Sequence, residues 1–128
     1  MAPDEFTIAL PGDAQAAGIA RKFVHEHRDD LPASLIEDAQ LLVSEVVTNA
    51  VLHGEPDITL AMHVTGPGLG FVVTDSGEGR PVRPDHRPES DRPYGRGLFI
   101  LDALATAWGV TDKNPTPGKS VWFDLAPN

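Results

Sequence analysis

The sequence predicts an α+β domain, a two-layer sandwich in which about three helices cover one face of a mixed, mostly antiparallel sheet. Alternating apolar and polar residues mark short strands in both halves of the chain. Apolar residues at three- and four-residue spacing mark helices between those strands. The chain has 128 residues and no internal repeat, so we expect residues 1–128 to form a single domain.

The first half of the chain predicts one strand followed by two helices. Residues 6–10 alternate as a half-buried strand does, and Asp13 can cap the helix that follows. After a break, Ser34 and Glu37 have the three-residue spacing of a capping box. The helix that starts there is expected to run to about His53.

The second half predicts a hairpin, a long loop, a helix and a second hairpin. Residues 58–64 and 69–74 alternate on either side of a glycine-containing turn. Residues 76–94 contain four prolines and almost no apolar residue, and so long a loop in a small domain is usually functional. The remaining elements are a helix over 98–107 and strands over 108–111 and 119–125.

Charge and composition exclude several classes of protein. Asp and Glu number 19 against 10 Lys and Arg, and the resulting net charge of -9 argues against non-specific binding to DNA or to anionic membrane. The absence of cysteine excludes disulfides, thiolate nucleophiles and cysteine-bound zinc. No apolar run approaches the roughly 20 residues of a membrane span, and the N-terminus does not resemble a signal peptide. We therefore expect a cytoplasmic protein with no direct nucleic-acid or membrane partner.

The first candidate site lies on the second predicted helix. Glu45 and Asn49 are four residues apart, so they project from one side of the helix, at the edge of its apolar stripe, and His53 continues that side. A carboxylate and an amide oxygen suit a hard cation such as Mg²⁺, or the carboxylate acts as a base toward a hydroxyl or water. The alternative is a solvated helix edge.

The second candidate is Asp75-Ser76-Gly77-Glu78-Gly79, which begins where an apolar strand ends. An aspartate at a strand end accepts hydrogen bonds well, and Gly77 and Gly79 allow the backbone to come close to a ligand. Because the pattern is short, an acidic turn is the alternative.

The third candidate is Gly95-Arg96-Gly97-Leu98, at the start of the helix predicted over 98–107. Unpaired main-chain amides at a helix start favour an anion, and glycines let a phosphate approach. Positions 80–96 hold five of the ten basic residues against three acidic ones. This local positive excess in an acidic chain indicates a lid that faces phosphate, and the alternative is a solvated loop balanced by neighbouring acids.

Taken together, these motifs resemble those of the GHKL superfamily of ATPases and kinases, whose nucleotide-binding domain has the Bergerat fold. The resemblance covers residues 31–125, with the motifs in the family's order: an N-box at 45–54, a G1 box at 75–79, a G2 box at 95–98 and the last nucleotide motif at 118–123. The N-terminal strand and helix also resemble the branch of bacterial anti-sigma-factor serine kinases.

The resemblance implies a binding site for ATP and Mg²⁺. In that site, Asn49 holds the magnesium ion, and Glu45 is the general base for an acceptor serine hydroxyl. Asp75 accepts the adenine amino group, and Gly77 and Gly79 let the backbone pass the base and the sugar.

For the phosphates, the resemblance implies amides from Gly95 and Gly97 beneath a lid over residues 80–94. The other residues that it assigns to the nucleotide are His53, Arg80, Arg96, Leu98, Lys119 and Ser120. Of these, Lys119 and Arg96 are expected to contact phosphate, and Ser120 is expected to lie near the adenine end.

The same resemblance implies a serine-protein kinase that also acts as an anti-sigma factor. Such a protein sequesters a sigma factor and phosphorylates an anti-anti-sigma protein of the STAS type on serine. A homodimer is implied by the family alone. The alternative is a nucleotide-dependent regulatory binding module without significant kinase activity, since a base in position does not prove turnover.

Overall fold

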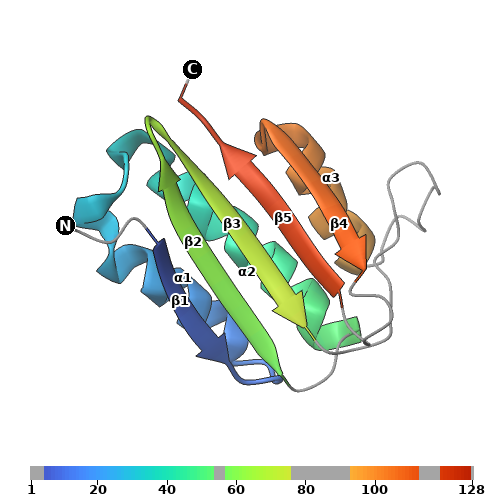
Figure 1. Ribbon diagram of the computed structural model, residues 1–128. Helices are drawn as coiled ribbons and strands as arrows, with labels where there is room; N and C mark the ends of the chain where they lie inside the picture. The colour runs from blue at the N-terminus through green and yellow to red at the C-terminus, as the bar shows by residue number, and fades with distance from the viewer. Residues whose placement is uncertain (1–4, 54–56, 76–92, 113–118, 128) are drawn as a thin grey trace.

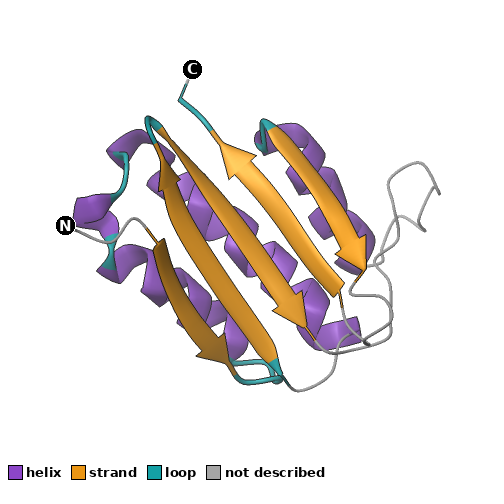
Figure 2. Ribbon diagram, viewed as in Figure 1, coloured by secondary structure: helices purple, strands orange, loops and turns teal. Residues whose placement is uncertain are grey.

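The computed structural model describes residues 5–53, 57–75, 93–112 and 119–127, which form a five-stranded sheet packed against helices (Figure 1). The strands follow the order β1-β2-β3-β5-β4. The three α-helices lie on one face of this sheet, and no helix of the described residues covers the other face (Figure 2). The elements are β1 (Glu5–Leu10), α1 (Ala16–Glu26), η1 (Arg28–Asp30), η2 (Ala33–Leu35), α2 (Ile36–His53), β2 (Ile58–Thr65), β3 (Gly68–Asp75), α3 (Pro93–Leu104), β4 (Ala107–Asp112) and β5 (Lys119–Leu125).

The α+β two-layer architecture is confirmed, with one correction to the sheet. All four strand pairings of the described sheet are antiparallel, whereas the sequence predicts a mixed, mostly antiparallel sheet. The chain connects β3 to β4 through α3, and these two strands run in the same direction. They form no parallel pair because β5 lies between them and pairs with both.

Two expected helix caps take a different form. Asp13 Oδ1 accepts a hydrogen bond from the Gln15 amide at 2.9 Å, so Asp13 stabilises the turn before α1 and is not its N-cap residue. Ser34 lies inside the 3₁₀ turn η2, which leads directly into α2 and has Pro32 at its N-cap. A residue inside a helical turn is not its N-cap, so the expected capping box of Ser34 and Glu37 does not start this helix.

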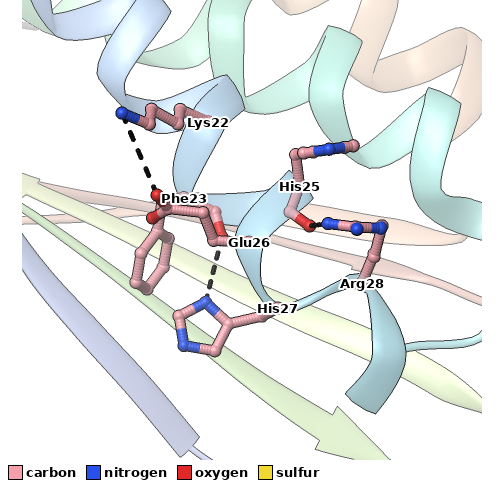
Figure 3. A network of polar contacts seen from close by, with 6 residues as sticks. All are labelled: Lys22, Phe23, His25, Glu26, His27 and Arg28. Atoms are coloured by element: carbon pink, nitrogen blue, oxygen red, sulfur yellow. Dashed lines mark hydrogen bonds and ion pairs between the residues drawn. The ribbon is translucent and has the colours of Figure 1, made fainter.

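The C-terminal end of α1, whose polar contacts are shown in Figure 3, is attached to β1 by an aromatic contact. The His27 ring lies against the rings of Phe6 and Phe23, with centroids 4.3 and 4.8 Å apart. His27 Nδ1 is 2.9 Å from the Phe23 carbonyl oxygen, and Arg28 donates a hydrogen bond to the His25 carbonyl oxygen at 2.8 Å. These contacts satisfy carbonyls that a helix end otherwise leaves without partners.

Helix α3 begins and ends earlier than predicted, at Pro93–Leu104 and not 98–107. Proline is favourable at the first helical position, because the N–H that it lacks has no partner there. The early start places Gly95 and Gly97 inside the helix, and the early end leaves Ala107 free to begin β4.

The core lies between the helices and the sheet face that they cover. Along β3 and β5, alternate apolar side chains point to that face, and the rings of Phe71 and Phe123 stack with centroids 4.8 Å apart. From α2, Leu42, Val43 and Val47 are fully buried against them. None of the helices in the described ranges combines the length and hydropathy needed to cross a membrane.

Candidate functional site

Asp75 and Lys119 form a buried ion pair at the end of the sheet where β3 ends and β5 begins. Lys119 Nζ lies 3.0 Å from Asp75 Oδ2, and the two side chains are only 4% and 2% exposed. The residues are direct cross-strand neighbours. Although the distance makes an ion pair, the ammonium forms no hydrogen bond of regular geometry with any described residue. The site predicted at the end of β3 therefore contains a buried charge of each sign.

The alternation of the two strands explains why both charges face the helices. In β3, Phe71 and Val73 precede Asp75 at two-residue steps, and in β5 Val121 follows Lys119 at the same step. Because alternate side chains of a strand point to one face, the charged pair continues the apolar rows of the core. The pair thus lies at the end of the core, where the strands meet the loops.

Asn49 and Glu45 lie on α2, whose C-terminal end reaches this same end of the sheet (Figure 1). Asn49 is 6% exposed, and its buried Oδ1 has no hydrogen-bond partner among the described residues. Leaving such an acceptor unsatisfied costs about 1–3 kcal/mol, which a bound ion or ligand would remove. Glu45, one turn earlier, is half-buried, so it lies beside the core without being enclosed by it.

The residues predicted to bind phosphate fall in the first two turns of α3. Gly95 is in the first turn, where main-chain N–H groups have no partner within the helix. Gly97 and Leu98 are in the second turn, where N–H groups point to the carbonyls of the first. Within the helix as it stands, Gly95 is thus the predicted glycine best placed to offer an amide to an anion.

Ser120 is not brought to Asp75. It follows Lys119 by one residue, so its side chain points to the face of the sheet that lacks helices. There its hydroxyl lies 3.0 Å from that of its cross-strand neighbour Thr74. The structure therefore places Lys119, and not Ser120, beside the carboxylate expected to bind the base.

Several predicted positions lie outside what the structure describes. Gly77, Gly79 and Arg80 are among them, together with residues 81–92 of the expected lid. The lid's last two residues, 93 and 94, belong to α3. The side chains of His53, Arg96 and Leu98 are not described either, although their backbones are helical. The roles expected for these residues stay predictions.

The resemblance assigned Lys119 to phosphate and gave no indication that it pairs with Asp75. The sequence does contain part of the signal, because Lys119 is in phase with Val121 and Phe123 and must share their face. Which residue of β3 lies opposite depends on the register, and a single sequence does not fix that register.

The described side chains fit the demands of phosphoryl transfer with ATP and magnesium. Mg²⁺ takes oxygen ligands and commonly only one or two from the protein, the others coming from phosphates and water, so the unsatisfied amide oxygen of Asn49 suits it. A carboxylate one helical turn away, as that of Glu45 is, suits a base toward a hydroxyl. Among the described residues, no three His, Cys, Asp or Glu side chains gather as a metal cluster.

Comparison with known sequences gives a family match over most of the chain. Residues 10–124 match the histidine kinase-like ATPase domain family. A protein of Oceanobacillus iheyensis named serine-protein kinase RsbW is 27% identical over 118 residues, and one of Listeria innocua with the same name is 30% identical over 118 residues. Each alignment covers 79% of this chain and 75% of the relative.

Solved structures give the same fold. The histidine kinase domain of a blue-light activated histidine kinase from Erythrobacter litoralis superposes with a TM-score of 0.51 at 30% identity. That match covers 70% of this chain but only 45% of the kinase chain. The Acinetobacter baumannii histidine kinase AdeS superposes with a TM-score of 0.54 over 96% of this chain and 68% of its own, at 10% identity, and shows similarity of fold alone.

Proposed function

Since the chain belongs to the histidine kinase-like ATPase family, we propose that it is an anti-sigma factor with ATP- and magnesium-dependent serine-protein kinase activity. The observation that carries the proposal is that relatives named serine-protein kinase align over 79% of the chain. Glu45 and Asn49 lie one turn apart on α2, and Asn49 Oδ1 has no hydrogen-bond partner among the described residues. This placement supports the proposal independently.

In this proposal each residue has one task. Asn49 binds the magnesium ion that accompanies ATP, and Asp75 accepts a hydrogen bond from the adenine amino group. Glu45 orients the serine hydroxyl of the acceptor protein. As the serine oxygen bonds to the γ-phosphorus, the bond to the β,γ-bridging oxygen breaks and ADP leaves, while the hydroxyl proton passes to the Glu45 carboxylate. The first-turn amide of Gly95 stabilises the phosphate charge.

The proposed partners are a sigma factor, which the protein sequesters, and an anti-anti-sigma protein of the STAS type, which it phosphorylates. The net charge of -9 is compatible with basic partner surfaces, such as the DNA-facing regions of a sigma factor. The homodimer that the family implies belongs to the same proposal.

Phosphate transfer from γ-labelled ATP tests the kinase proposal. The protein is incubated with Mg²⁺ and purified STAS proteins encoded in the same genome, and label is expected on serine of one of them. Glu45→Gln should lower the transfer rate by at least about 100-fold while ATP affinity stays within about twofold, because the base acts on the hydroxyl and not on the nucleotide. Glu37→Gln is the matched control, since Glu37 is an exposed acid in the first turn of the same helix.

The outcome separates the two functions that the sequence left open. ATP binding without transfer to any of these proteins would contradict the kinase proposal. If Glu45→Gln then also left partner binding unchanged, a nucleotide-dependent binding module would be the better description.

A further inference from the structure

Lys119 is a buried ammonium at the position where the proposed function places the nucleobase. We propose that Lys119 and Asp75 act together as the base-reading pair, with Lys119 donating a hydrogen bond to a ring acceptor beside the amino group that Asp75 accepts. The inference rests on the proposed ATP site but assigns Lys119 to the base, where the resemblance had assigned it to phosphate.

The Lys119 ammonium has hydrogen-bonding capacity that the described residues do not use. Lys119 has three donors, its side chain is 4% exposed, and Asp75 is the described partner of its charge. One donor faces Asp75 Oδ2 at 3.0 Å, and the other two have no hydrogen-bond partner among the described residues. Buried donors are costly when unsatisfied, and a charged one more so, which favours a ligand that brings an acceptor to this point.

The charged pair is not needed to hold β3 and β5 together. The next two positions on the same face, Val73 with Val121 and Phe71 with Phe123, are direct apolar cross-strand pairs that are buried. A buried ion pair is weak evidence for stability, because desolvation of both charges offsets their attraction. A third apolar pair would stabilise the two strands at least as well, so the charges indicate recognition of a ligand.

The chemistry of the pair matches one edge of adenine. On that edge the 6-amino group is a donor and the neighbouring ring nitrogen N1 is an acceptor. A carboxylate oxygen and an ammonium 3.0 Å apart present the complementary acceptor and donor side by side. Hydrogen bonds that involve a charged group are about twice as strong as neutral ones, so Lys119 should contribute measurably to base affinity.

Deleting the acceptor atom from the ligand tests this without altering the protein. Calorimetric titration of the full chain with Mg²⁺ compares ATP with 1-deaza-ATP, which lacks only N1, and with 7-deaza-ATP, a matched control that keeps the whole edge. We expect 1-deaza-ATP to bind about 10- to 100-fold more weakly than ATP, the factor for one hydrogen bond to a charged donor. We expect 7-deaza-ATP to bind within about threefold of ATP.

Lys119→Met then locates the effect on the protein. In this variant ATP and 1-deaza-ATP should bind with equal affinity, because the donor that distinguishes them is gone. If the single variant does not fold by circular dichroism, the comparison of ATP with 1-deaza-ATP on the wild-type protein decides the inference by itself.

Three results would overturn the inference that Lys119 binds the base. Equal affinity of the wild-type protein for ATP and 1-deaza-ATP would overturn the assignment of Lys119 and leave the proposed function intact. Tighter ATP binding by Lys119→Met would also overturn it, since Lys119 would then only compete for Asp75. No binding of ATP to the wild-type protein would instead refute the proposed nucleotide site, and the inference with it.

Discussion

Two cross-strand pairs on the same face of β3 and β5 make the sharpest comparison within this molecule. Phe71 and Phe123 lie in the middle of the strands, stack with their ring centroids 4.8 Å apart, and are completely buried. Asp75 and Lys119 lie four residues further along in the same register, equally buried but charged. Both pairs belong to one antiparallel ladder and lie on one face, so the comparison is between an aromatic and a charged pair of side chains.

The comparison separates residues that stabilise the sheet from residues that we propose bind the nucleotide. Burial of two aromatic rings is strongly favourable, whereas burial of two charges gains little free energy of folding. A buried charged pair at the end of an apolar row is a departure from the local packing pattern, which supports the proposed binding role of these two residues. Four predictions test this division, from the largest expected effect to the smallest.

Removing an aromatic ring from the central pair should have the largest effect on stability. Phe123→Ala is expected to lower the free energy of unfolding by about 3–5 kcal/mol, through lost burial and the cavity that remains. Urea denaturation measures it. Trp122→Ala, on the opposite and half-buried face of the same strand, serves as the control and should cost less. An equal or smaller loss for Phe123→Ala would contradict the assignment of the core.

Breaking the charged pair should be costly only when one partner remains. Lys119→Met is expected to lower the free energy of unfolding by about 3 kcal/mol, because it leaves the Asp75 carboxylate buried without its cation. Asp75→Leu combined with Lys119→Met should recover at least half of that loss in urea denaturation, yet bind ATP at least about tenfold more weakly than wild type. Recovery of both stability and binding would remove the functional role from the pair.

The start of β3, where Gly68 and Gly70 lie, should be sensitive to the size of an added side chain and not to its charge. A Cβ added at Gly68 would overlap the main-chain carbonyl oxygen of Leu125, so Gly68→Ala is expected to destabilise by about 1–3 kcal/mol. At Gly70 the same atom would meet the His63 ring, which can rotate away, so Gly70→Ala should cost less than about 1 kcal/mol. Thermal melting of both variants checks the order, and the reverse order would contradict the register of β2, β3 and β5.

The hydroxyl pair on the open face should have the smallest effect. Ser120→Ala removes the hydrogen bond to Thr74 and is expected to cost about 0.5–1.5 kcal/mol in urea denaturation. ATP affinity should not change, because Ser120 points away from the face that carries Asp75. A tenfold loss of ATP affinity in Ser120→Ala would show that the nucleotide reaches that face, as the sequence resemblance implied.

Regular alternation made the central strands predictable to within about one residue at each end. Residues 58–64 and 69–74 were expected, and β2 and β3 span Ile58–Thr65 and Gly68–Asp75. The start of α3 was not predictable in this way, because proline and glycine at 93–97 usually signal a loop and are tolerated here at a helix start. The local sequence pattern therefore identified elements in which regular alternation continues over many residues. It failed at the start of α3, where proline and glycine indicate a loop.

Sequence motifs predicted the part of the candidate site that depends on local spacing, but not the part that depends on strand pairing. Spacing alone placed Glu45 and Asn49 on one side of a helix, and α2 confirms that they lie one turn apart. The choice between Lys119 and Ser120 was not accessible, because it depends on which of two adjacent residues shares a face with Asp75. That choice is set by the β3–β5 register, a long-range property that only the folded sheet fixes.

Binding of ATP, titrated by calorimetry with and without Mg²⁺, tests the central claim most directly. We predict magnesium-dependent binding by the wild-type protein, weakened at least about tenfold in Asp75→Asn and in Asn49→Ala. We predict unchanged binding in Thr74→Val, which alters the neighbour of Asp75 on the opposite face of the sheet. Binding that survives both site variants, or no binding by the wild-type protein, would contradict a nucleotide site at this end of the sheet.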